Sequence, residues 1–194
     1  MVSLKEEKTF LMIKPDGVRK GLIGEIIRRI EQRDLKIVAL EMFHPTKEQI
    51  NEHYPKDEKW IRRLGQKTFA IYTKYGLDAL KDFGTNDDLE MGKMVRQWLV
   101  DFMISAPSVK MVVQGLHAVD MVRKIVGPTI PSNAEMGTIR GDFSVDSPAQ
   151  ANKEKRAVFN LVHASETAEE ASHEIKLWFG NEPIHDYKRF GVDE

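Results

Sequence analysis

The amino acids at positions 9–17 read TFLMIKPDG, and this stretch decides how the chain begins to fold. Its first part, Thr9–Ile13, is a short apolar run that follows a charged segment, which is typical of a buried central strand. Pro15 and the pair Asp16-Gly17 then end the strand, because proline lacks a backbone N–H and Asp-Gly favours turns. The stretch therefore predicts a buried strand that leads directly into a polar turn.

Similar patterns further along the chain predict an alternation of strands and helices. Branched apolar residues predict three more strands, over 37–43, 109–114 and 157–162. Apolar residues at helical spacing predict helices over about 22–30, 91–103, 119–126 and 168–179, and a capping-box pattern at 46–49 begins a shorter one. Four short strands with interspersed helices predict an α+β fold, a ferredoxin-like βαββαβ sandwich with a four-stranded antiparallel sheet and extra helices.

Three segments carry weaker patterns. Between 55 and 91, Thr68–Tyr72 could be a strand and Leu77–Phe83 a turn or two of helix. The stretch Gly127–Asp142 is long for a loop in a compact domain, and such loops are usually functional or disordered. Ser144–Arg156 is polar and is predicted to be a loop. The length fits one domain over residues 1–194, with room for insertions.

Composition and charge exclude several classes of protein. The chain has 194 residues, of which 29 are Lys or Arg and 30 are Asp or Glu, and the absence of cysteine excludes disulfide frameworks and thiolate metal sites. Its longest apolar runs have four residues and its start is charged, so we expect neither a transmembrane helix nor a secretory leader. A formal net charge of −1 argues against non-specific nucleic-acid binding. We therefore expect a cytoplasmic protein with no membrane and no specific nucleic-acid partner.

Several polar residues stand at strand ends and around the long loop. Lys14 follows the first strand, Arg123, Thr129 and Arg140 lie on or near the loop, and His163 ends the fourth strand. Each alone is the kind of residue that is usually solvated or structural. Together, one histidine, several cations and a threonine form a plausible phosphate pocket. The sequence has no P-loop, no Gly-x-Gly-x-x-Gly, no clustered metal ligands and no Gly-x-Ser-x-Gly elbow, so these common sites are excluded.

Three motifs resemble those of the nucleoside diphosphate kinases. KTFLMIKPDGV at 8–18 resembles the opening signature of that family, and GTIRGDF at 137–143 resembles its Gly-Thr-Ile-Arg-Gly-Asp-Phe segment. NLVHAS at 160–165 resembles its Asn-x-x-His-x-Ser active-site signature. The resemblance covers residues 7–55 and roughly 93–187 in the family's order. It implies a nucleoside diphosphate kinase.

The resemblance also implies a role for each matching residue. His163 would be the nucleophile that takes up the phosphoryl group, Glu174 the carboxylate that hydrogen-bonds its ring, and Ser165 a hydroxyl in the same network. The matching nucleotide-binding positions are Lys14, Tyr54, Arg123, Thr129, Arg140 and Asn160. No residue is expected to bind a metal directly, because Mg²⁺ commonly binds through substrate phosphates. The implied partners are nucleoside di- and triphosphates and further copies of the chain, as a hexamer or tetramer with Pro131 in a contact loop.

The chemistry of these residue types fits the implied roles. An imidazole has an unperturbed pKa of about 6.5, so a good fraction is neutral at pH 7. A carboxylate that accepts the N–H of one ring nitrogen leaves the lone pair of the other free to attack. Phosphoryl transfer places charge on peripheral oxygens, which Lys14, Arg123 and Arg140 would face. We therefore expect a ping-pong transfer through a phosphohistidine on His163.

The sequence departs from the family pattern in three places. Glu166 stands where an aspartate usually follows the serine, which keeps the charge and is expected to have a modest effect. Residues of about 56–92 and 144–155 are expected to be insertions, which either decorate the surface or form a lid or an oligomer contact. The first of them displaces the aromatic residue that stacks on the base, for which the candidates are Trp60, Phe69 and Trp98.

Two other functions stay open at this point. The long insertion near the base site would suit a non-catalytic nucleotide-binding or scaffold protein on the same fold, although the intact set of site residues argues against it. A nucleic-acid binder has only the local cations in its favour.

Overall fold

A four-stranded antiparallel sheet forms the centre of the protein. The computed structural model describes residues 6–189, and the charged start of the chain, residues 1–5, lies outside this range. The strands are β1 (Glu7–Ile13), β2 (Lys36–Phe43), β3 (Ser108–Gly115) and β4 (Val162–Ala164), in the order β2-β3-β1-β4. The expected α+β fold of ferredoxin-like type, with its four-stranded antiparallel sheet, is confirmed.

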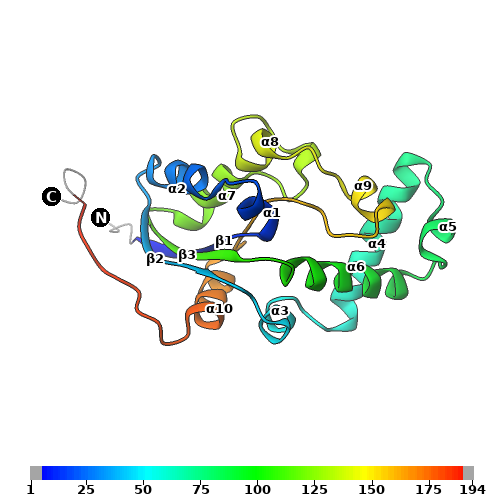
Figure 1. Ribbon diagram of the computed structural model, residues 1–194, viewed down its shortest axis with the longest axis horizontal. Helices are drawn as coiled ribbons and strands as arrows, with labels where there is room; N and C mark the ends of the chain where they lie inside the picture. The colour runs from blue at the N-terminus through cyan, green and yellow to red at the C-terminus, as the bar shows by residue number, and fades with distance from the viewer. Residues whose placement is uncertain (1–5, 190–194) are drawn as a thin grey trace, which may run out of the picture.

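Helices surround this sheet (Figure 1). Along the described chain they are α1 (Pro15–Arg19), α2 (Ile23–Glu31), α3 (Lys47–His53), α4 (Glu58–Tyr75), α5 (Ala79–Phe83), α6 (Asp88–Met103), α7 (Ala118–Val126), the 3₁₀ turn η1 (Pro131–Asn133), α8 (Ile139–Phe143), α9 (Pro148–Lys153) and α10 (Ala168–Phe179). No helix of residues 6–189 is long and apolar enough to cross a bilayer.

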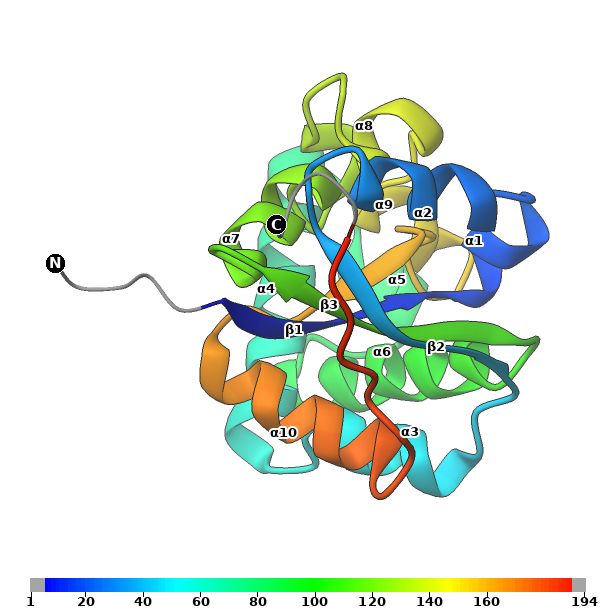
Figure 2. The same ribbon diagram turned by 90° about the vertical axis from the view of Figure 1, so that its left-hand side faces the viewer.

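Helices cover both faces of the sheet (Figure 2), and each face carries a hydrophobic core. Helices α2 and α7 cover the face to which β1 contributes Leu11 and Ile13. Helices α3, α6 and α10 cover the face to which β1 contributes Phe10 and Met12. All four side chains are fully buried, because successive residues of a strand point to opposite faces and both faces are covered. This arrangement is the buried central strand that TFLMI predicts.

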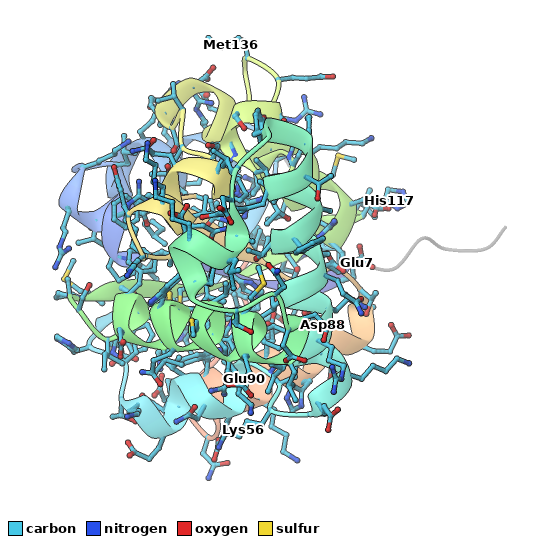
Figure 3. The ribbon with its side chains drawn as sticks, turned by 90° about the vertical axis from the view of Figure 1, so that its right-hand side faces the viewer. Glu7, Lys56, Asp88, Glu90, His117 and Met136 are labelled. Atoms are coloured by element: carbon cyan, nitrogen blue, oxygen red, sulfur yellow. The ribbon has the colours of Figure 1, made fainter. Side chains whose placement is uncertain are left out.

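Helices α4, α5 and α6 form an extension at one end of the sheet (Figures 1 and 3). The backbones of α4 and α6 approach each other closely at two glycines. A Cβ atom added to Gly65 would lie 1.8 Å from the Asp88 carbonyl oxygen, and one added to Gly92 would lie 2.0 Å from the Ile61 carbonyl oxygen. A third core cluster, around Tyr72, Phe83 and Met91, fills the space between the helices. The first predicted insertion segment is therefore mostly helical.

Several local predictions were wrong. Thr68–Tyr72, considered as a strand, lies inside α4. The predicted fourth strand, 157–162, is shifted, because pairing with β1 begins only at Val162 and the preceding residues turn sharply. The predicted turn after β1 is the short helix α1, with Pro15 in its first turn, where a missing N–H costs nothing. The predicted loops after 127 and 144 contain η1, α8 and α9.

The chain after α10 runs back along the outer strand β2 (Figure 2). The His185 N–H donates to the Val38 carbonyl at 2.8 Å. The buried Lys110 ammonium anchors the start of this segment, because it donates to the Trp178 carbonyl at 2.6 Å and contacts the carboxylate of Glu182. The segment therefore covers part of an otherwise open sheet edge.

Candidate active site

A cleft of about 520 Å³ opens beside the end of β4. Its walls come from segments far apart in the sequence: the residue after β1, helices α3, α4 and α7, the loop after α7, and α8, β4 and α10. Eight of the nine predicted site residues line this cleft: Lys14, Tyr54, Arg123, Thr129, Arg140, Asn160, His163 and Glu174. The ninth, Ser165, lies directly behind them and is fully buried.

His163 is held by a carboxylate and a hydroxyl. Its Nε2 lies 2.6 Å from Oε1 of Glu174, and the Ser165 hydroxyl donates to Oε2 of the same carboxylate at 2.6 Å. Glu174 is reached from α10, whose N-cap is Thr167. A carboxylate beside Nε2 favours the tautomer that carries its proton there, which leaves the lone pair of Nδ1 free.

The surroundings of His163 keep its ring neutral. Burial, followed by the charges of Lys14, Arg140 and Arg123, lowers the pKa of His163 to about 3. Burial also raises the pKa of Glu174, against the opposing effect of its polar neighbours. At neutral pH the site therefore holds an uncharged imidazole among cations, which is the form that can act as a nucleophile.

Lys14 and Asn160 form the floor of the cleft. The Lys14 ammonium donates to Oδ1 of Asn160 at 2.8 Å, and Nδ2 of Asn160 donates to the Thr129 carbonyl at 3.0 Å. Burial and the neighbouring Arg140 lower the pKa of Lys14 to about 8, so the ammonium is still mostly protonated at pH 7. These contacts tie the end of β1 and the loop after α7 to the segment before His163.

Arg140 bridges the loop and the nucleophile segment. Its guanidinium donates to the carbonyls of Gly127, Asn160 and Val162 at 2.7, 3.0 and 2.7 Å. A guanidinium has five N–H groups, so two remain for an anion in the cleft. Burial lowers its pKa to about 10, which still leaves it charged at neutral pH.

Arg123 lies at the exposed mouth. Its nearest acid is Glu166, at 3.7 Å, and both side chains are largely exposed. Such an ion pair is weak, so the guanidinium can turn to an incoming anion. Glu166 thus pairs with Arg123 and also lines the cleft.

The opposite wall contains residues that the motifs do not include. The His53 ring lies 4.6 Å from the His163 ring, and its Nδ1 is 3.3 Å from Glu174 and accepts from the Trp178 indole at 3.4 Å. Burial lowers the pKa of His53 to about 3. A single histidine at a helix end gives no sequence signal, although the Thr46 capping box that begins α3 was recognisable and is present.

Helix α4 also lines this wall, with Trp60, Arg63 and Lys67. Of the three aromatic candidates for base stacking, Trp60 is the one that lines the cleft, beside Tyr54 at a ring distance of 6.2 Å. Phe69 lies two residues beyond Lys67 and is exposed, while Trp98 packs against Phe83. The sequence did not predict Arg63 and Lys67, because α4 itself was not recognised.

His53, His163 and Glu174 are the group of side chains within residues 6–189 that could hold a metal ion. However, Nε2 of His163 and the Glu174 oxygen are 2.6 Å apart, a hydrogen-bond distance. Two ligands of a tetrahedral zinc ion would be about 3.3 Å apart, given metal–ligand bonds of about 2.0 Å. His163 and Glu174 are therefore arranged as a hydrogen-bonded pair, with the His53 ring packed beside them.

Comparison with known proteins decides the family. The model of the nucleoside diphosphate kinase family matches residues 7–70 and 88–184. This chain belongs to the nucleoside diphosphate kinase family. A nucleoside diphosphate kinase of Pyrobaculum aerophilum is 50% identical over 178 residues, which cover 92% of this chain and 97% of the relative. One of Pyrococcus abyssi is 38% identical and covers 97% and 94%.

Solved nucleoside diphosphate kinases share the fold. The crystal structure of the Pyrobaculum aerophilum enzyme has a TM-score of 0.89 at 47% identity, and it covers 94% of this chain and all of its own. A Borrelia burgdorferi enzyme, solved as a transition-state mimic with vanadate and ADP, has a TM-score of 0.76 at 32% identity and covers 97% and 95%. This chain is therefore a nucleoside diphosphate kinase, an enzyme of nucleotide metabolism. The family match omits residues 71–87, inside the first predicted insertion, and includes 144–155; the division into one domain with two insertions stays a prediction.

Proposed function

We propose that this nucleoside diphosphate kinase carries the phosphoryl group on Nδ1 of His163. In the first half-reaction, Nδ1 bonds to the γ-phosphorus of a nucleoside triphosphate while the bond to the β–γ bridging oxygen breaks and the diphosphate leaves. In the second, an oxygen of another nucleoside diphosphate takes the phosphoryl group and Nδ1 regains its lone pair. The observation that carries this proposal is the 2.6 Å contact between Nε2 and Glu174, because it leaves Nδ1 as the free nitrogen.

The cations of the cleft would stabilise the charge that develops on the transferred group. Lys14, Arg123 and Arg140 surround the cleft, and the hydroxyls of Tyr54 and Thr129 would add neutral donors. Asn160, fixed by Lys14, would contact the ribose hydroxyls, and Trp60 would stack on the base. Stacking on an aromatic ring discriminates little between bases, so we expect broad nucleotide specificity.

Mg²⁺ would reach this cleft with the nucleotide. The carboxylate nearest His163, that of Glu174, is already engaged by His163 and Ser165, and the charged groups that face the ring from the other side are cations. Phosphate oxygens and water would therefore hold the ion. Bound there, it would neutralise part of the phosphate charge. We also infer a cytoplasmic homo-oligomer, a hexamer or tetramer; the exposed Leu40 and Met42 on the edge strand β2 support a contact between copies.

Labelling with γ-³²P-ATP and Mg²⁺ tests the nucleophile. We expect an acid-labile, alkali-stable phosphoprotein from the wild type, and none from His163→Ala. His117→Asn, at an exposed position outside this cleft, is the matched control and should label normally. Labelling of His163→Ala would overturn the assignment.

The competing scaffold function predicts a different result. A scaffold would bind ADP but would not exchange the terminal phosphate between nucleotides. A coupled turnover assay beside an ADP titration separates the two functions, and binding without exchange would favour the scaffold.

A further inference from the structure

A strained turn stands immediately before the proposed nucleophile. Leu161 has a φ of +70°, a conformation that costs a branched side chain free energy. The Val162 N–H donates to the Asn160 carbonyl at 2.8 Å, which closes a γ-turn of the rare, strained kind. The Leu161 side chain is fully buried, so it anchors the turn in the core.

Four hydrogen bonds from outside the turn hold it in this shape. The backbone N–H of Lys14 donates to the Leu161 carbonyl at 2.8 Å. Arg140 donates to the carbonyls on either side of Leu161, at 3.0 and 2.7 Å. The carboxylate of Asp16 accepts the Leu161 N–H at 2.9 Å. A strained conformation persists only when its surroundings over-determine it, and here the surroundings do so.

Asp16 is a costly residue for this place. It is only 6% exposed, and its second oxygen, Oδ1, is buried without a hydrogen-bond partner among the described residues. A buried, half-satisfied carboxylate destabilises a fold. Its neighbour Gly17 brings α1 directly onto the turn, since a Cβ there would lie 2.8 Å from the Leu161 carbonyl oxygen. Packing alone therefore does not account for an acid at this position.

We propose that Asp16 is a positioning residue for phosphoryl transfer, whose carboxylate holds the γ-turn at Leu161 and thereby aims His163. This inference rests on the function proposed above, in which His163 is the nucleophile. Asp16 does not line the cleft, so it acts through the backbone rather than on the nucleotide.

The charge of Asp16 has a second effect, on Lys14. Burial and Arg140 lower the pKa of Lys14, and the Asp16 carboxylate opposes them. The other ionisable groups that face Lys14 are His53 and His163, both neutral at pH 7. Removing the Asp16 charge therefore lowers the pKa of Lys14 further, below its present value of about 8.

Two substitutions separate geometry from charge. Asp16→Ala removes the acceptor of the Leu161 N–H, and we expect single-turnover phosphorylation of His163 to slow by roughly 10- to 100-fold, as small misplacements of reacting groups do. Measured at pH 6.5, the dissociation constant of ADP should stay within about threefold, because Arg123 and Arg140 remain charged and line the cleft. Asp16→Asn keeps an acceptor oxygen, so at pH 6.5 it should restore the rate, while its alkaline fall in kcat/KM should begin at lower pH than in the wild type.

Asp146→Ala is the structural control. Asp146 accepts the Phe159 N–H at 2.7 Å in the same segment but outside the turn. It should lower the melting temperature as Asp16→Ala does, without the same loss of phosphorylation rate. An equal loss of rate in the two variants at equal stability would overturn the proposal, as would a wild-type rate in Asp16→Ala.

Hydrogen exchange of the Leu161 amide, followed by NMR without nucleotide, tests independently of catalysis whether Asp16 holds the γ-turn. We expect strong protection in the wild type and Asp16→Asn and fast exchange in Asp16→Ala. If His163 does not become phosphorylated at all, the proposed nucleophile is wrong, and this exchange experiment still decides whether Asp16 holds the turn. If Asp16→Ala does not fold, the Leu161 amide of the folded Asp16→Asn variant decides the question. Fast exchange of this amide would overturn the role of Asp16 in holding the turn, and retained protection would support it.

Discussion

His163 combines two properties that usually exclude each other: it is surrounded by cations and yet it is built to attack an anion. The cations would attract the phosphates, while burial, followed by these charges, lowers the pKa of the imidazole to about 3 and so preserves its lone pair. Glu174 resolves the remaining ambiguity, because its contact with Nε2 assigns the nucleophilic nitrogen.

Glu174→Ala should therefore impair the chemical step more than nucleotide binding. The substitution leaves Nε2 and the Ser165 hydroxyl without their common partner, so the tautomer and the ring orientation are no longer fixed. We expect kcat to fall by roughly 10- to 100-fold, as for other groups that orient a catalytic histidine, with a small change in KM. Steady-state kinetics would measure this, and Glu169→Ala, an exposed acid on the same helix, should behave as wild type. A change in KM alone would contradict the orienting role.

The pH profile of kcat/KM should be set by Lys14 rather than by His163. Because the folded pKa of His163 is about 3, no decline should centre on the free imidazole value of about 6.5. The folded pKa of Lys14 is about 8, so the ammonium is lost, and the rate falls, as the pH rises through that value. Lys14→Arg, which stays charged, should lack this alkaline fall even though its overall rate is lower. An unchanged alkaline limb in that variant would assign the titration to another group.

At the scale of elements, α4 explains both a failure of sequence reasoning and an addition to the site. Thr68–Tyr72 is rich in aromatic and β-branched residues, which favours a strand in isolation. The helix signals stood at its two ends: Asp57 accepts the Trp60 N–H as N-cap, and Gly76 ends the helix in the left-handed conformation. Eighteen residues of helix packed on α6 outweigh a local strand preference.

Arg63 and Lys67, four residues apart on α4, should contribute to nucleotide binding. Both line the cleft, both are exposed, and within residues 6–189 neither side chain has an ion-pair or hydrogen-bond partner. We expect the double substitution to Ala to raise KM for the nucleotide by roughly 2- to 10-fold with little change in kcat, the effect of exposed charges, and to weaken at high salt. Lys59→Ala, an exposed charge on the same helix outside the cleft, is the control. An equal rise of KM in the control variant would show that the loss of positive charge, rather than the position of Arg63 and Lys67 in the cleft, causes the effect.

The crossing of α4 and α6 depends on glycine. In Gly92→Ala the new methyl group would lie 2.0 Å from the Ile61 carbonyl oxygen, so the helices must separate. We expect a loss of about 1–3 kcal/mol in the free energy of unfolding, as for other overpacked positions, measured by urea denaturation. Gly24→Ala in α2 meets nothing within 4 Å and should be neutral or stabilising by up to about 1 kcal/mol. Equal stability of the two variants would contradict the close approach.

At the scale of the whole molecule, the sequence predicted those features that depend on neighbouring residues. The strand TFLMI, the residues after it and the segment around His163 are local patterns, and such patterns predict the succession of strands and helices along the chain. The clustering of the nine predicted residues came from motif resemblance. His53, Arg63 and Lys67 reach the site only through packing of distant elements, and no local pattern marks such residues. Asp16 stands in the opening motif, but its contact with the turn at Leu161 joins segments far apart in the sequence.

The outer strand β2 exposes two large apolar side chains. Leu40 and Met42 are 51% and 57% exposed on this strand, although the C-terminal segment runs beside it. Exposed apolar side chains on an edge strand favour pairing with another chain. If the proposed homo-oligomer forms here, the double variant Leu40→Glu, Met42→Lys should sediment as a smaller species at micromolar concentration. Leu80→Glu, which replaces an equally exposed leucine on α5, should leave the assembly intact. A monomeric wild type would contradict the oligomer, and an unchanged mass of the double variant would place its contacts on another face.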